Sequence, residues 1–292
     1  MPSNAIDLPA RVYEKCQFAH AHIALALHLL CACLALAILR LCYNLLMNTK
    51  PYLTRYITFG GGVDSTALLV AANLGLCNTH NVDFAIYIDC GSDHPDTISH
   101  VQSMQKWSRI PVYIFQTPTS MIDDLLSPNG FVSIPACLWP RGILRRQCTN
   151  MYKIKWVHKF VREFIGLKRY QHIKGKVQGL YGINADEAHR AKGSMEKWID
   201  ADYPLVTSGF TRADCRELCS KSGLPIPRRS SCICCPLHTK NEWAELKGDG
   251  NNPQWKTIIK IDDAIRNRDF EKSGRKCFLS CRFKPISEVN FS

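Results

Sequence analysis

Three consecutive glycines, Gly60 to Gly62, precede an acidic and a hydroxyl side chain, Asp64 and Ser65. The run before them, Tyr56 to Phe59, is β-branched and aromatic, and an apolar helical pattern follows Ser65. Glycine adopts a positive φ without a Cβ penalty, so the backbone N–H groups of such a loop can converge on an anion. The positive end of the helix dipole lies at the same place. The segment predicts a strand, a phosphate-binding loop and a helix start; a turn without ligand is the alternative.

The loop lacks the lysine of a Walker loop. It resembles the Ser-Gly-Gly-x-Asp-Ser loop of the PP-loop family of ATP pyrophosphatases, with Gly60 in place of the first serine. The resemblance implies that an adenine nucleotide, ATP or PAPS, is bound with Mg²⁺, and that Asp64 and Ser65 are catalytic, Asp64 positioning the Mg²⁺ or the nucleotide. The implied phosphate-binding residues are Gly60, Gly61, Gly62, Asp64, Ser65 and Thr66.

Two more apolar strands are expected at 84–88 and 111–115, with a helical pattern between them that ends at Trp107. Strands that alternate with helices at this spacing predict a doubly wound parallel α/β sheet, with ligands at the carboxyl ends of the strands. Asp89 falls at such an end, and the segment from Asp89 to Thr97 resembles the Asp-Thr-Gly and Pro-Glu-Thr segments of the PAPS reductase branch. Cys90 stands where that pattern has threonine. The implied fold is adenine nucleotide alpha-hydrolase-like.

Two later segments extend the resemblance. The string from Arg145 to Ile154 leads into a helix reaching about Ile165, and a strand at 177–183 breaks into a polar segment that begins at Asn184. They resemble the family's Cys-Cys-x-x-x-Lys-Val and Gly-x-Arg-x-x-Glu-x-x-x-Arg segments, with Asn184 in place of the first arginine of the latter. The nucleotide ligands that this implies are Asp89, Arg146, Lys153, Glu187 and Arg190. A solvated basic helix start is the alternative for the basic residues.

The chain has 15 cysteines, without regular pairing or a cleavable signal before them, which argues against a secreted disulfide scaffold. The Cys232–Cys235 segment has the Cys-x-x-Cys spacing that lets two thiolates reach one metal. In the similar iron–sulfur APS reductases, a Cys-Cys pair and a distant Cys-x-x-Cys hold a [4Fe–4S] cluster. The ligands that this implies here are Cys148, Cys232 and Cys235, with Cys234 as the fourth and Cys137, Cys215 or Cys219 as other candidates for it.

Zinc at these cysteines, or no metal at all, are alternatives to the cluster. Cys277 and Cys281 are expected to be packing residues, because the C-terminal tail lacks the Glu-Cys-Gly-Leu-His string of PAPS and APS reductases. The resemblance, over about residues 54 to 288, is therefore to PAPS reductase-like proteins. It implies adenylyl transfer to a substrate with release of pyrophosphate, and sulfur transfer after it. A thiol-dependent PAPS or APS reductase and a non-catalytic nucleotide- or nucleic-acid-binding module are the alternatives.

Composition and charge suggest the domain organisation and the partners. We expect a hydrophobic extension at 1–46, a nucleotide-binding domain at 47–203 and a cysteine-rich region at 204–292. Between Ile23 and Leu39 only His28 is polar, so this run is a membrane anchor, a signal peptide, a buried helix or an extension upstream of a start at Met47. The expected location is cytoplasmic, with a membrane-anchored form if the run is an anchor. The net charge of +12 and its dispersed basic runs fit tRNA or DNA, or only phosphorylated small molecules.

Overall fold

The computed structural model describes residues 52–268 and 274–291, which divide into two compact units. The first unit contains residues 52–87, His100–Tyr113 and Arg162–Arg228. The second contains Ile88–Ser99, Ile114–Val161 and the described residues from Arg229 onward. The extension predicted at 1–46, its apolar run and Met47 lie outside the described residues, and the predicted boundaries at 47 and 204 stay predictions. In the ranges that are described, no helix has both the length and the apolar character that crossing a membrane requires.

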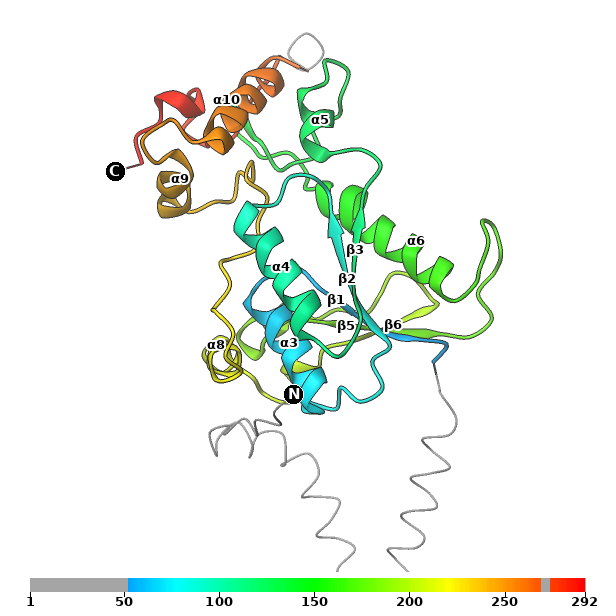
Figure 1. Cartoon of the computed structure of the whole chain (residues 1–292). Helices are drawn as coiled ribbons and strands as arrows, with labels where there is room; N and C mark the ends of the chain where they lie inside the picture. The colour runs from blue at the N-terminus through cyan, green and yellow to red at the C-terminus, as the bar shows by residue number, and fades with distance from the viewer. Residues whose placement is uncertain (1–51, 269–273, 292) are drawn as a thin grey trace, which may run out of the picture. The chain divides into compact units, whose positions relative to one another are not determined.

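A five-stranded sheet in the order β3-β2-β1-β5-β6 forms the centre of the fold (Figure 1). Its pairs β1–β2, β1–β5 and β5–β6 are parallel. The central strand is buried, as in sheets covered on both faces. The expected class, α/β with a parallel sheet and a cysteine-rich C-terminal region, is confirmed. The strands are β1 (Arg55–Thr58), β2 (Phe84–Asp89), β3 (Val112–Gln116), β5 (Val177–Tyr181) and β6 (Ile199–Asp202).

Helices α3 and α8 pack against each other in the first unit (Figure 1). Helix α3 ends at Gly75, whose φ of 69° gives the left-handed cap that glycine provides without strain. Helix α8 starts with a capping box, in which Thr211 and Asp214 satisfy each other's backbone N–H groups. The helical segments in or partly in this unit are α3 (Val63–Leu74), α4 (Pro95–Trp107), the end of α6 (Lys155–Phe164), η2 (Ala185–Arg190), α7 (Pro204–Thr207) and α8 (Arg212–Lys221).

The second unit is built around helix α10, which packs against α5, α9 and strand β7. Strands β4 and β7 form an antiparallel pair. The residues between α9 and α10 form a loop. The elements are α5 (Met121–Leu126), β4 (Cys137–Trp139), η1 (Asn150–Ile154), α6 (Lys155–Phe164), α9 (Lys240–Lys247), α10 (Pro253–Arg266), β7 (Lys276–Phe278) and η3 (Ile286–Glu288), with α6 continuing into the first unit.

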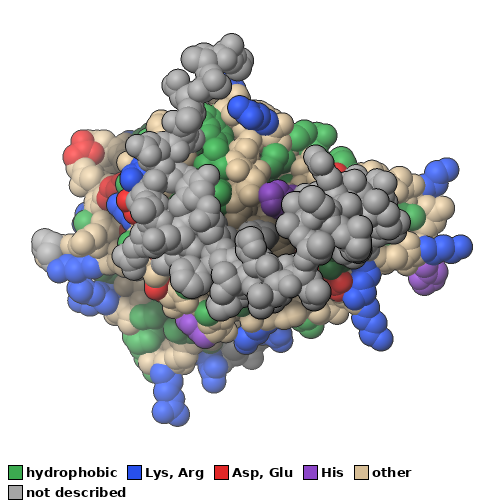
Figure 2. Space-filling model, turned by 90° about the horizontal axis from the view of Figure 1, so that it is seen from below, with side chains coloured by type: hydrophobic (Ala, Val, Ile, Leu, Met, Phe, Trp, Pro, Cys, Tyr) green, Lys and Arg blue, Asp and Glu red, His purple; other side chains and the backbone are tan. Residues whose placement is uncertain are grey.

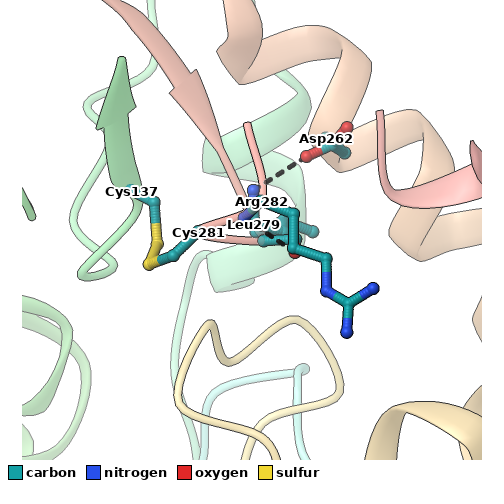
Figure 3. Close-up of a disulfide and its surroundings, with 6 residues drawn as sticks. Cys137, Asp262, Leu279, Cys281 and Arg282 are labelled. Atoms are coloured by element: carbon teal, nitrogen blue, oxygen red, sulfur yellow. Dashed lines mark hydrogen bonds between the residues drawn. A yellow bond between two sulfur atoms is a disulfide. The ribbon is translucent and has the colours of Figure 1, made fainter. Parts of the chain in front are cut away.

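A disulfide joins Cys137 to Cys281 (Figure 3). The expectation that Cys281 is a packing residue is therefore wrong, and Cys137 is no longer a thiol that could bind a metal. The β4–β7 pairing places Cys137 beside Phe278, three residues before Cys281, which brings the two Cα atoms to 5.1 Å. Cys277 is buried in the core of this unit, as expected.

Asp262 on α10 is a buried carboxylate that organises the C-terminal segment (Figure 3). Its oxygens accept hydrogen bonds from the backbone N–H groups of Leu279, at 2.8 Å, and Ile286, at 3.0 Å. Arg266, one helical turn along, forms an ion pair with it. The carboxylate thus satisfies two buried donors and is itself compensated, so removing it would leave the N–H groups without a partner.

We expect Asp262→Ala to lower the free energy of unfolding by about 3 kcal/mol, because two buried N–H groups lose their acceptor and the partly buried Arg266 keeps only Asp263 as a partner. Asp263→Ala is the matched control. Asp263 also pairs with Arg266, but its side chain is 57% exposed, and we expect a change of at most about 0.5 kcal/mol. Urea denaturation measures both values, and equal losses in the two variants would contradict the role given to Asp262.

Candidate functional site

The glycine loop has the backbone that the sequence predicts. Gly61 has a φ of 71°, in the left-handed region, and Gly62 is the N-cap of α3. The N–H of Thr66 donates to the Gly62 carbonyl at 2.9 Å, and the Ser65 hydroxyl donates to the same oxygen at 3.1 Å. The sharp turn therefore leads directly into the helix N-terminus.

Asp64, the second residue of α3, has one satisfied and one unsatisfied carboxylate oxygen. Its Oδ2 accepts from the Asn184 side chain, at 3.1 Å, and from Arg212. Its Oδ1 is buried and has no hydrogen-bond partner among the described residues. A buried carboxylate oxygen without a donor is costly, so this atom is suited to a cation or a ligand donor.

Asn184 and Arg212 hold Asp64 in place, and sequence analysis did not anticipate these contacts. Asn184, which replaces an arginine of the family pattern, also caps η2 by accepting from the N–H groups of Asp186 and Glu187. Arg212 is the first residue of α8, and its own N–H donates to Asp186 at 2.8 Å. Only its position directly after Thr211, the N-cap residue of α8, could have drawn attention to it.

The other predicted residues of the first unit lie close to this loop in sequence or in the fold. Thr66 is buried, and its hydroxyl is 2.9 Å from Nε2 of His100, whose pKa is lowered by burial. Glu187 and Arg190 form an ion pair with each other on η2 and are partly exposed. Each of them is therefore partly compensated by the other, although both side chains keep exposed surface.

Cys215 and Cys219, candidates for a metal ligand, face the core of the first unit. Burial, with the charge of Asp64, raises the pKa of Cys215 well above its ordinary value and that of Cys219 to about 12. Both side chains are therefore neutral thiols at physiological pH, which suits packing between α3 and α8.

A second cluster, Cys90–Asp93–Cys232, lies wholly in the second unit. The ligand atoms of its three side chains all lie within 4.8 Å of one another. The Cys232 thiol is 3.7 Å from Oδ1 of Asp93, and the Cys90 sulfur is 3.2 Å from the Ser92 hydroxyl. The pKa of Cys90 is lowered by a hydrogen bond from Cys232. Burial would raise this pKa, and the charge of Lys153 lowers it further.

Lys153, predicted to bind a nucleotide phosphate, forms an ion pair with Asp93. Its ammonium is 3.2 Å from each carboxylate oxygen. Burial by itself would lower the pKa of Lys153, but the charges of Asp93, Cys232 and Cys90 raise it above its ordinary value. The lysine therefore remains charged beside the two thiols.

The remaining predicted thiols are neighbours of this cluster. Burial raises the pKa of Cys234, and the charges of Cys232, Cys235 and Cys148 raise it further. Burial also raises the pKa of Cys235, and the charge of Arg146 opposes this rise. Across residues 52–268 and 274–291, however, the one group of three potential ligands with mutual distances within 4.8 Å is Cys90–Asp93–Cys232.

Asp89 and Cys90 occupy the predicted carboxyl end of β2. The Asp89 carboxylate accepts from the N–H of Gly91 at 2.8 Å, which fixes the turn after the strand. Cys90 and Asp93 were not among the metal ligands predicted from the sequence. The signal that could have found Cys90 was a thiol at a strand end where ligands gather.

Comparisons with known proteins add a likeness to solved structures. No protein-family model and no curated protein matches the chain. The crystal structure of phosphoadenylyl-sulfate (PAPS) reductase from Candida auris, a phosphate complex, is similar with 15% sequence identity and a TM-score of 0.41. The match covers 60% of this chain and 75% of that one.

We expect Gly182→Ala to disturb the glycine loop, because a Cβ there would lie 2.6 Å from the Cα and 2.7 Å from the N of Ser65. These are backbone atoms, so we expect a loss of about 1–3 kcal/mol in the free energy of unfolding. At Gly193, a Cβ would meet no atom within 4 Å. Gly193→Ala should therefore stay within about 0.5 kcal/mol of the parent protein. Chemical denaturation compares the two, and an unaffected Gly182→Ala would disprove the close approach.

Proposed function

We propose that this protein is a PP-loop enzyme that binds an adenine nucleotide, ATP or PAPS, by its phosphates at the glycine loop. The observation that carries the proposal is the Oδ1 atom of Asp64, which is buried and has no hydrogen-bond partner within residues 52–268 and 274–291. It belongs to the same loop as Gly61, which has a left-handed conformation. A helix N-terminus, a turn of glycines and an uncompensated carboxylate oxygen together favour a phosphate with its counter-cation.

Each part of the loop has a role in this proposal. The N–H groups of the glycine turn and the start of α3 would bind phosphate oxygens, and Asn184 and Arg212 would orient Asp64 through Oδ2. Mg²⁺ fits the residues present, because Oδ1 is an oxygen ligand of the kind that it prefers. When bound, Mg²⁺ would neutralise phosphate charge.

Adenylyl transfer is the reaction that we assign to this site. A substrate oxygen attacks the α-phosphorus of ATP, a new P–O bond forms, and the bond to the bridging oxygen breaks. Pyrophosphate leaves with the electron pair of that bond. The residues of the loop act by positioning and by stabilising charge, which is the main contribution of proteins to phosphoryl chemistry. Sulfur transfer to the adenylylated product is the step that the family resemblance suggests next.

A thiol-dependent reductase of PAPS or APS is the second candidate, and the disulfide counts against it. Such a reaction needs a nucleophilic thiol in the C-terminal tail. In the described part of that tail, 274–291, Cys281 is joined to Cys137 and Cys277 is buried in the core.

A nucleic-acid-binding module, with tRNA or DNA as partner, is supported by net charge alone. On the face shown in Figure 2, Lys and Arg side chains stand in several separate groups rather than in one patch. Some basic residues are also compensated within the protein: Lys176 pairs with Asp200, and Arg229 with Glu242. This weakens the case for a continuous polyanion surface.

The iron–sulfur cluster suggested for Cys148, Cys232, Cys235 and Cys234 stays a prediction. A [4Fe–4S] cluster is held by four thiolates. The group of three potential ligands that contains Cys232 is completed instead by one thiol and one carboxylate, those of Cys90 and Asp93. This donor set does not fit an all-thiolate cluster, and it fits the zinc alternative better.

The nucleotide site is tested by Gly61→Ala, which we expect to weaken ATP or PAPS binding at least about tenfold, since a Cβ keeps phosphate away from the backbone. Gly223→Ala is the matched control. Gly223 has the same φ of 71°, and a Cβ there would meet no atom within 4 Å. Gly223→Ala therefore introduces the same backbone strain as Gly61→Ala at a position where no ligand is proposed.

Calorimetric titration with ATP–Mg²⁺ and with PAPS gives the affinities, and release of pyrophosphate reports the reaction. Equal nucleotide affinities in Gly61→Ala, Gly223→Ala and the parent protein would refute the phosphate site. Binding of ATP without pyrophosphate release from any acceptor would favour the non-catalytic module.

A further inference from the structure

We propose that Cys90, Asp93 and Cys232 bind a single divalent ion of the zinc class through two thiolates and one carboxylate. The fourth position of this ion is left to water or a substrate. This inference goes beyond the nucleotide site and does not depend on it, because every residue that carries it lies in the second unit.

The distances match those around such an ion. Zinc bonds of about 2.0–2.3 Å and tetrahedral angles place neighbouring ligand atoms about 3.5–3.8 Å apart. The Cys232 sulfur lies 3.7 Å from the Asp93 oxygen, and all three ligand atoms lie within 4.8 Å of one another. Small side-chain rotations would therefore close the site without movement of the backbone.

The backbone holds the two ligand segments together. Asp93 and Cys232 form an isolated antiparallel bridge. The N–H of Ile233 donates to the Ser92 carbonyl at 2.8 Å, and that of Met121 donates to the Cys90 carbonyl at 2.9 Å. Ligands that are distant in sequence are thus fixed before any ion binds, which lowers the entropic cost of binding.

The donor types select the class of ion. Two thiolates exclude a preference for Mg²⁺ or Ca²⁺, which take oxygen ligands. A carboxylate beside two thiolates is a donor set that zinc accepts. Three protein ligands with one open position are the arrangement of catalytic rather than structural zinc sites.

The charges of the site balance with such an ion in place. Two thiolates and Asp93 carry three negative charges, which a divalent ion and the Lys153 ammonium neutralise. Lys153 lies 3.2 Å from both carboxylate oxygens, so it can keep its bond to the oxygen that does not bind the ion. An outer partner of this kind orients a ligating carboxylate. A buried site with no net charge avoids the desolvation cost of an uncompensated one.

Titration with Co²⁺, a coloured substitute for zinc, tests the proposal on the full-length protein after removal of metal by chelation. We expect the parent protein to bind one Co²⁺ with a thiolate-to-cobalt absorption band, and Zn²⁺ to displace it. Cys90→Ser, Cys232→Ser and Asp93→Asn should each weaken Co²⁺ binding at least about tenfold. Asp93→Asn keeps the side-chain shape and so tests the ligand even if a cysteine variant fails to fold.

Three other thiols serve as controls. We expect Co²⁺ binding as in the parent protein for Cys148→Ser and Cys235→Ser, whose cysteines were predicted as ligands of an all-cysteine cluster. We expect the same for Cys277→Ser, which changes a buried packing thiol. Gly61→Ala should also bind it normally, so failure of the nucleotide site is distinguishable from failure of this one. The proposal is overturned if the parent shows no thiolate-to-cobalt band. It is also overturned if Cys148→Ser or Cys235→Ser loses the ion while Asp93→Asn keeps it.

Discussion

The contact between Asp64 and its two partners is the interaction on which the first unit's site depends. Asp64 belongs to the start of α3, Asn184 follows β5, and Arg212 begins α8. One carboxylate oxygen therefore connects three segments, each of which is positioned by a different element of the fold. The parallel sheet makes this meeting possible, because the segments after β1 and β5 leave neighbouring strands at the same edge.

Local sequence patterns were sufficient for β1, β2, β3 and β5 and for several helices, whereas no strand was predicted at β4, β6 or β7. The strands, the glycine turn and the Thr211 cap each rest on residues a few positions apart, where alternation, turn chemistry and capping act directly. The sites depend on pairings at long range. Arg212 is 148 residues from Asp64, Cys232 is 139 from Asp93, and Cys281 is 144 from Cys137. No periodicity encodes such pairings. The Cys-x-x-Cys motif therefore predicted Cys232 as a ligand, but it could not indicate Cys90 or Asp93.

Three of the buried carboxylates in the described residues form an ion pair with a basic side chain. Asp64 pairs with Arg212, Asp93 with Lys153, and Asp262 with Arg266. Burial of a carboxylate requires compensation of this kind, so the ion pair by itself says little about function.

What distinguishes the three carboxylates is the use of their oxygens. In Asp262, both oxygens accept from backbone N–H groups, which leaves no capacity for a ligand. In Asp64, Oδ1 is buried with no donor among the described residues. In Asp93, one oxygen lies 3.7 Å from the thiol of Cys232. On losing its proton, this thiol would become a metal ligand. The same pairing of carboxylate and base therefore stabilises the fold around Asp262 and holds the carboxylates of the two sites that we propose.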